Sequence, residues 1–144
     1  NPIPMFEPGF QGYGSVTEEY PLYAAGFHHK SRTHSSFGFI EELEEVARQE
    51  AWINPVDAEE RGIKNGDRCS VKSPAGEIRI DAKVTPRIVP GVVGIPQGAW
   101  HNADMNGNRI DEGGCVNTLS TYKPTPLSKG NGNAHSMIVQ VAKA

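Results

Sequence analysis

Asn54 and Asp57 are the first candidates for ligand chemistry, in the segment WINPVDA at residues 52–58. Asn54 suits the N-cap of a short helix, Pro55 suits its first position, and Gly62 suits its end. An amide and a carboxylate beside a helix N-terminus can recognise the polar edge of a ligand. The same two residues can instead only cap the helix, and local chemistry alone favours that role.

A histidine-rich polar stretch supplies the second group of candidates. His28 and His29 are adjacent and would point to opposite faces of a strand, which disfavours a metal site. Arg32 offers a planar fork of donors for phosphate or carboxylate, His34 lies two residues further on, and Ser35 adds a hydroxyl. The stretch therefore suits an anionic ligand better than a metal ion. A solvated basic loop is the alternative.

The third group follows the glycine pair at residues 113–114, where backbone amides can approach a ligand closely. The amide of Asn117 can both donate to and accept from a heterocycle, and Thr118 adds a hydroxyl. A turn-stabilising asparagine is the alternative. The sequence contains no GxSxG, HExxH, Walker A or GxGxxG motif, so we assign no catalytic residue and no protein ligand to a metal.

Composition bounds the class of protein. The chain has 144 residues and a formal net charge of -3, which argues against a dedicated nucleic-acid binder. No apolar run approaches the roughly 20 residues that span a bilayer, so we expect no direct membrane contact. Cys69 and Cys115 form no CxxC pair, and we expect two buried thiols rather than a disulfide.

The elements that must position these residues are short. Apolar alternation and turn signals predict strands at residues 20–25, 68–73, 78–84, 92–95 and 136–141, a brief strand or turn at 116–120, and helices at 39–46 and 55–61. We expect an amphipathic helix at 39–46, with Phe39, Ile40, Leu43 and Val46 on its apolar face. Many short strands favour a small closed β-barrel, because closure removes exposed edges. Prolines and glycines in residues 1–19 indicate an arm or interdomain linker, which leaves 20–144 as the domain.

Four motifs occur in an order that resembles one known family: HxxxRxHS at 28–35, WINPxDA at 52–58, IPQGAW at 95–100 and GGCVNTLS at 113–120. Together they are similar to the C-terminal molybdopterin-dinucleotide-binding domain of the dimethyl sulfoxide reductase family of molybdenum enzymes. The resemblance covers roughly residues 20 to 142. The third and fourth motifs look most like the catalytic A subunits of membrane-bound dimethyl sulfoxide reductases.

The resemblance implies a mainly β fold, a double-psi β-barrel with one or two short helices, that binds bis(molybdopterin guanine dinucleotide). Asn54 and Asp57 would recognise a guanine, while Arg32, His34 and Ser35 would contact pterin or pyrophosphate. Asn117 and Thr118 would hydrogen-bond a pterin. Gln97 and Trp100 would line the same cleft, with His28 and His135 as further candidates.

The resemblance also says what this chain lacks. In the family, molybdenum is held by pterin dithiolenes and usually one side chain of an upstream domain, and the iron–sulfur cysteines also lie upstream. We therefore expect a soluble fragment, inactive alone, of an anaerobic respiratory oxidoreductase that reduces S-oxides or N-oxides. Its partners would be the upstream domains, an iron–sulfur subunit and a membrane-anchor subunit, at the periplasmic face of the inner membrane.

Two other classes of function were weighed. Double-psi barrels also serve as substrate-recruiting interaction modules of AAA ATPases, and such a module would present an apolar surface groove. A free-standing small enzyme is disfavoured, because the sequence shows no acid–base or nucleophile set.

Overall fold

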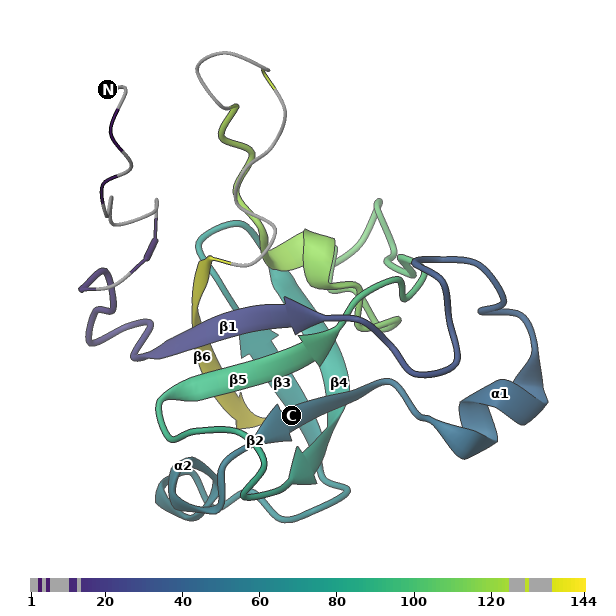
Figure 1. Cartoon of the computed structure of the whole chain (residues 1–144), viewed down its shortest axis with the longest axis horizontal. Helices are drawn as coiled ribbons and strands as arrows, with labels where there is room; N and C mark the ends of the chain where they lie inside the picture. Colours follow the sequence, from purple (N-terminus) through teal and green to yellow (C-terminus); the bar gives the residue numbers. More distant parts are fainter. Residues whose placement is uncertain (1–2, 4, 6–10, 13, 125–128, 130–135) are drawn as a thin grey trace.

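The chain folds into a closed β-barrel, and side chains along its strands alternate between buried and exposed. The computed structural model describes residues 3, 5, 11, 12, 14–124, 129 and 136–144. Within them, six strands close into a barrel in the order β1-β5-β2-β4-β3-β6 (Figure 1). The strands are β1 (Leu22–Phe27), β2 (Glu50–Ile53), β3 (Arg68–Lys72), β4 (Glu77–Val84), β5 (Val92–Pro96) and β6 (Met137–Lys143). In β4, Ile78, Ile80 and Ala82 are buried in turn, as the sequence pattern predicted.

Two pairs of neighbouring strands are parallel, and this arrangement decides where the loops begin. β1 runs parallel to β5, with Tyr23 opposite Val92 and Phe27 opposite Pro96. β2 runs parallel to β4 and antiparallel to β5. β6 closes the barrel by pairing antiparallel with both β1 and β3. The loops that follow β1 and β5 therefore leave the barrel at the same edge. The expected mainly β, double-psi barrel class is confirmed.

Helices are short and lie outside the barrel. They are α1 (Glu41–Val46), α2 (Pro55–Glu60) and a 3-10 helix, η1 (Val116–Leu119). α2 confirms the capping prediction, because the Asn54 side chain accepts a hydrogen bond from Val56 N–H and Pro55 begins the helix. The brief strand or turn expected at 116–120 is the helix η1.

The apolar face predicted for the helix at 39–46 is not buried. α1 forms as a helix, but none of its residues is buried, and Val46 is 79% exposed. Phe39, which precedes the helix, is 71% exposed. Figure 1 shows α1 projecting away from the barrel. The predicted helix is therefore present over Glu41–Val46, but its apolar side does not pack into the core of this chain.

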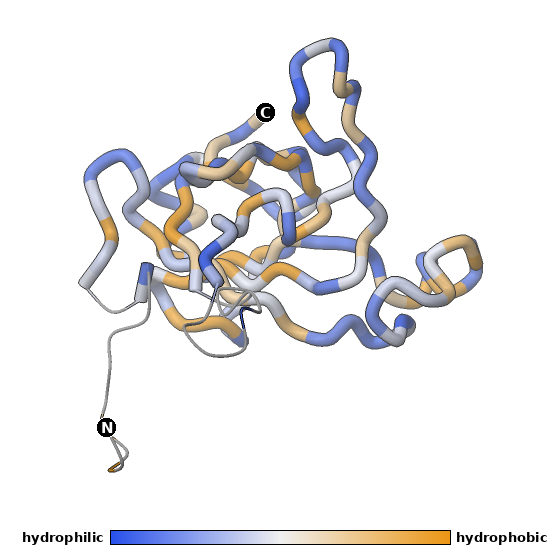
Figure 2. The backbone as a smooth tube through the Cα atoms, turned by 90° about the horizontal axis from the view of Figure 1, so that it is seen from above, coloured by the Kyte–Doolittle hydropathy of each residue, from blue (hydrophilic) through white to orange (hydrophobic). Residues whose placement is uncertain are grey.

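The barrel interior is apolar, and Figure 2 shows that hydrophilic residues predominate in the outer loops. Cys69 and Cys115 are both buried and free, as expected. Among the described residues, no helix is long and apolar enough to cross a membrane.

Candidate pterin-binding cavity

Four of the predicted site residues line one cavity. His34, Ser35, Gln97 and Asn117 surround a space of about 210 Å³, together with backbone and small side chains of the segments 97–99 and 115–117. We call this space the pterin cavity, after the ligand that the resemblance implies for its residues. Its lining comes from three segments that lie far apart in the sequence, so the closed barrel is needed to assemble it.

The parallel pairing of β1 and β5 brings two of these segments together. Residues 28–36 follow β1, and residues 97–100 follow β5. At their contact Gly98 has a φ of +89°, and a β-carbon there would overlap the carbonyl of His34. Trp100, whose indole Nε1–H donates to the carbonyl of Ser35 at 2.8 Å, joins the same two segments. Only glycine at position 98 allows this close approach.

Arg32 does not line the pterin cavity, but its side chain links the segments that form the cavity wall. Its side chain is only 4% exposed and forms an ion pair of 3.2 Å with Glu44 of α1. The guanidinium also donates to the side-chain oxygen of Gln49 and, at 3.5 Å, to the carbonyl of Gln97. Burial lowers the pKa of Arg32 and Glu44 raises it, with a net decrease. A guanidinium nevertheless stays charged at neutral pH.

Gln49 is a structural residue that the sequence did not reveal. Its side-chain nitrogen donates to the carbonyls of Pro96 and Gly114, each at 2.9 Å, while its oxygen accepts from Arg32. One side chain thus joins the segments that end β5, precede η1 and follow β1. A single glutamine before a strand carries no recognisable signal of this role.

Asp111 was also missed, and it shapes the segment that carries Asn117. The residue is fully buried, and its carboxylate accepts from the backbone N–H groups of Asn102, Gly113 and Cys115 at 2.8, 2.9 and 2.7 Å. Thr118 Oγ1 donates to it at 3.3 Å. The predicted ligand residue Thr118 therefore bonds to Asp111 and does not line the pterin cavity. An Asp two residues before a Gly-Gly pair is a turn signal that could have identified this residue.

Asn54 and Asp57 lie elsewhere. Both are buried, and their polar atoms bond to the chain's own backbone: Asn54 Nδ2 donates to the carbonyl of Ile88 at 2.7 Å, and Asp57 Oδ2 accepts from Gly91 N–H at 2.8 Å. They follow β2, which is antiparallel to β5. They therefore stand at the opposite end of the barrel from Gln97, as the position of α2 in Figure 1 shows.

The two histidine candidates separate as well. His28 stacks edge-on against His34, with ring centroids 5.5 Å apart, but lines a different pocket. His135 lies outside the described residues. No group of three or more metal-ligating side chains occurs among the residues that the structure describes.

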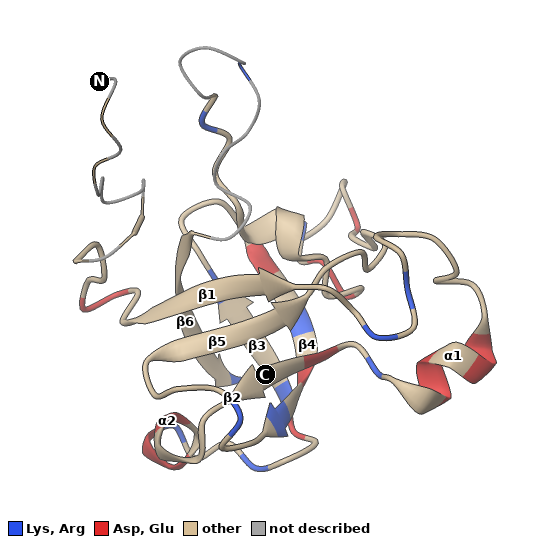
Figure 3. Ribbon diagram, viewed as in Figure 1, with Lys and Arg blue, Asp and Glu red and all other residues tan. Residues whose placement is uncertain are grey.

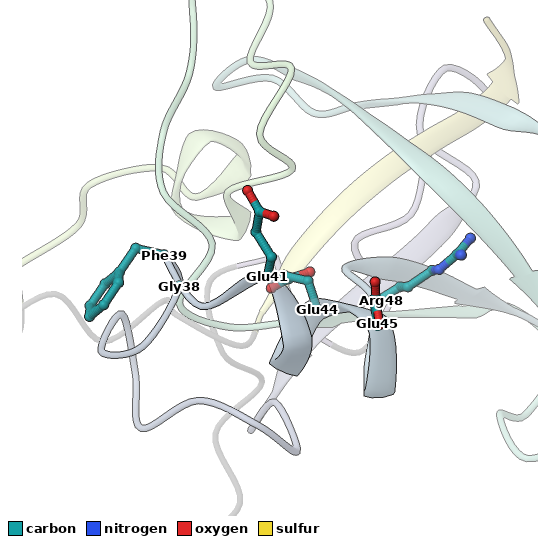
Figure 4. Close-up of a pocket in the computed structure, with 6 residues that line it drawn as sticks. All are labelled: Gly38, Phe39, Glu41, Glu44, Glu45 and Arg48. Atoms are coloured by element: carbon teal, nitrogen blue, oxygen red, sulfur yellow. The ribbon is translucent and has the colours of Figure 1, made fainter.

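A larger cavity beside α1 does not suit a phosphate-bearing ligand. It measures about 430 Å³ and is lined by Glu41, Glu44 and Glu45, with Arg48 as its one basic side chain. Figure 4 shows Phe39 directed away from these carboxylates. Carboxylates repel phosphate, and Figure 3 shows α1 as a concentration of acidic residues.

The residues of the pterin cavity fit the cofactor that the resemblance implies. A pterin presents ring nitrogens, an amine and a carbonyl, and an imidazole, a hydroxyl and two amides can donate to and accept from such a heterocycle. Gly98 also lines the cavity and lets the two loops meet closely there. Arg32 places a charged group behind the wall.

Comparison with known proteins shows the family to which the chain belongs. The family described as "Molydopterin dinucleotide binding domain" matches residues 22–137. The dimethyl sulfoxide reductase DmsA of Escherichia coli (strain K12) is 49% identical over 99% of this chain, which covers 17% of that protein. DmsA of Haemophilus influenzae is 47% identical over 99% of this chain and 18% of its own length. A trimethylamine-N-oxide reductase of Haemophilus influenzae is 35% identical over 90% of the chain and 16% of its own length.

A solved structure shows the same fold. The acetylene hydratase from Pelobacter acetylenicus superimposes with a TM-score of 0.80 at 19% identity, over 99% of this chain and 21% of that one. The chain thus spans less than a fifth of the length of the reductases that it matches. With the family match over most of its residues, the chain belongs to the molydopterin dinucleotide binding domain family.

Proposed function

We propose that this chain closes the pterin region of a bis(molybdopterin guanine dinucleotide) cofactor in a longer molybdenum oxidoreductase. The observation that carries the proposal is the meeting of His34, Ser35, Gln97 and Asn117 around one cavity. These residues come from segments after β1, after β5 and within η1. When bound, the cofactor supplies the redox chemistry, and the domain supplies binding and orientation.

Each side chain has a defined role in this proposal. The amides of Gln97 and Asn117 hydrogen-bond the polar edge of the pterin, and His34 and Ser35 contact it from the facing loop. Trp100 holds that loop through its bond to Ser35. Arg32 positions the wall through Glu44 and Gln49, so its effect on the ligand is indirect.

Guanine recognition by Asn54 and Asp57 is a separate part of the proposal. Asp57 Oδ2 accepts from Gly91 N–H. In this proposal the other carboxylate oxygen accepts a hydrogen bond from the guanine. These residues stand at the other end of the barrel from the pterin cavity, so a guanine there would belong to a different part of the ligand. Binding of the pterin and binding of the guanine must therefore be measured separately.

The longer protein would reduce S-oxides or N-oxides. This proposal is supported by the names of the relatives, which are dimethyl sulfoxide and trimethylamine-N-oxide reductases. The remaining domains would supply the metal ligand and the iron–sulfur cysteines, and this chain alone would be inactive. An iron–sulfur subunit and a membrane-anchor subunit at the periplasmic face complete the proposed assembly. The interaction-module alternative gains no support from the family match.

The test is an NMR titration of the chain with a reduced pterin, with GDP, and with ADP as control. Pterin should shift the amides of His34, Ser35, Gln97 and Asn117, and GDP but not ADP should shift those around Asn54 and Asp57. Asn117→Ala should weaken pterin binding on the order of tenfold, the loss of one or two hydrogen bonds.

Asn106→Ala is the matched control, because Asn106 is an exposed asparagine outside the cavity. Pterin shifts confined to the acidic cavity beside α1, or no shifts at millimolar pterin, would contradict the proposed site.

A further inference from the structure

Three large aromatic side chains are exposed beside the N-terminus of α1. They are Phe37, Phe39 and Trp100. Gly38, between the two phenylalanines, lies against the indole ring of Trp100, so the three residues form one group although they come from two segments. Single exposed apolar residues are ordinary, whereas a group of exposed aromatic residues is typical of an interaction surface.

The turn that carries the phenylalanines is held in place. Phe37 has a φ of +69°, in the left-handed region that a bulky side chain rarely adopts. Its carbonyl accepts from Ile40 N–H at 3.1 Å, which closes a turn directly before α1. On the other side, Trp100 contacts Gly38 and donates to the carbonyl of Ser35. The chain thus fixes an unfavourable backbone conformation that leaves Phe37 and Phe39 exposed to solvent.

The surface next to this aromatic group is acidic. The cavity of about 430 Å³ beside α1 is lined by Phe39 and by three glutamates, and Figure 4 shows Phe39 pointing away from them. Glu44 is paired with Arg32. Within the described part of the chain, no ion pair involves Glu41 or Glu45. We call the aromatic group and these glutamates together the α1 surface.

Charge decides what kind of protein can cover the α1 surface. A second copy of this chain, related by a two-fold axis through this surface, would place glutamates against glutamates, and like charges repel. A basic surface would instead be attracted to Glu41 and Glu45, and apolar side chains within it could bury Phe39. The fitting partner is therefore a basic protein surface with an apolar centre.

We propose that the α1 surface docks against a basic surface of another domain of the longer protein, an inference that rests on the proposed function. This chain covers only 17% and 18% of the two DmsA proteins that it matches, so most of such a protein lies outside it. Glu44 links α1 to Arg32, which also bonds to the carbonyl of Gln97. Docking at α1 would therefore also hold the wall of the pterin cavity.

Hydrogen exchange followed by mass spectrometry tests the docking, on the isolated chain and on the longer protein that contains it. Docking should slow the exchange of residues 37–46 in the longer protein about tenfold or more. In the longer protein, Phe39→Ser should speed this exchange about tenfold, because a buried aromatic anchor is lost. Met105→Ser is the matched control, since Met105 is exposed and apolar but lies outside the α1 surface, and its effect should stay below about twofold.

A charge reversal tests the basic character of the partner. In the longer protein, Glu45→Lys should speed the exchange of residues 37–46 about threefold at low salt and less at high salt, as expected for a partly exposed ion pair. Glu59→Lys is the matched control, because Glu59 is exposed on α2, and it should leave this exchange unchanged.

Three results would overturn the proposal. They are equal exchange of residues 37–46 in the two proteins, equal effects of a variant and its matched control, and a dimer of the isolated chain that Phe39→Ser abolishes in sedimentation. The last result would assign the surface to a second copy. The pterin titration uses the isolated chain, whose α1 surface is uncovered. Pterin shifts together with equal exchange would therefore reject the docking alone, and slowed exchange without pterin shifts would reject only the proposed function.

Discussion

Replacing Asp111 with alanine should destabilise the chain by several kcal/mol. The carboxylate is fully buried and accepts three backbone N–H groups, of which the bond from Cys115 is buried and the bonds from Asn102 and Gly113 are partly buried. An unsatisfied buried donor costs about 1–3 kcal/mol, and a partly buried one costs less because water can replace the carboxylate. The sum is about 3–5 kcal/mol, against a total stability of roughly 5–15 kcal/mol for a domain of ordinary size.

Urea unfolding of the chain, followed by circular dichroism, measures this loss. Asp104→Ala is the matched control, since Asp104 is exposed in the same loop and its carboxylate accepts a bond from Asn106 N–H. It should cost below about 1 kcal/mol. If Asp111→Ala costs no more than Asp104→Ala at an unchanged m-value, the Asp111 carboxylate does not hold this segment together, and the reasoning fails.

Three further predictions concern the walls of the pterin cavity and the core. Gly98→Ala should lower the free energy of unfolding in urea more than Gly66→Ala does. Both positions have φ near +90°, but only a β-carbon at 98 would overlap backbone atoms. Equal losses of stability in the two variants would show that the positive φ alone accounts for the effect. Gln49→Ala should weaken pterin binding in the NMR titration several-fold, because the carbonyls it joins are released; an unchanged affinity would show that the wall holds without it. Burial raises the pKa of the Cys69 thiol from 9.0 to about 11, so the thiol stays neutral up to a higher pH when folded. Cys69 is also fully buried, so in Cys115→Ser at pH 8 it should react with a disulfide reagent much more slowly in the folded chain than in urea, and equal rates would refute this.

Local chemistry made part of the fold predictable. The N-cap at Asn54 and the alternation in β4 need only neighbouring residues, and both appear in the structure as predicted. β2 was missed, because Glu50–Ile53 is four residues long and runs directly into the capping motif. An alternation of Ala51 and Ile53 is too short to tell a strand from the approach to a helix.

Packing was less predictable than conformation. The residues around α1 have helical periodicity, yet Phe39 and Val46 are exposed. Periodicity shows that a helix has an apolar face, and it does not show whether the surface that covers this face belongs to the same chain. The ion pair between Arg32 and Glu44 fixes α1 to the loop after β1, and a pattern of residue types could not have revealed it.

The sequence motifs named the candidate site residues, but they did not show which of them lie together. Four ordered motifs identified His34, Ser35, Gln97 and Asn117, which the barrel brings together. The same motifs grouped them with Asn54 and Asp57, which lie at the opposite end. Strand direction separates the two groups, and direction follows from long-range pairing that a single sequence does not display.

The position of β1 in the barrel has a consequence for synthesis of the chain. Both neighbours of β1 come much later: Tyr23 pairs with Val92 in β5 and with Ile138 in β6. At ribosomal rates of roughly 5–20 residues per second, β1 waits on the order of 10 s for its partners. During that time its two edges are open to other chains, and the barrel can close only when the last strand has left the ribosome. A chaperone that shields residues 22–27 until β6 has emerged should therefore raise the yield of folded domain.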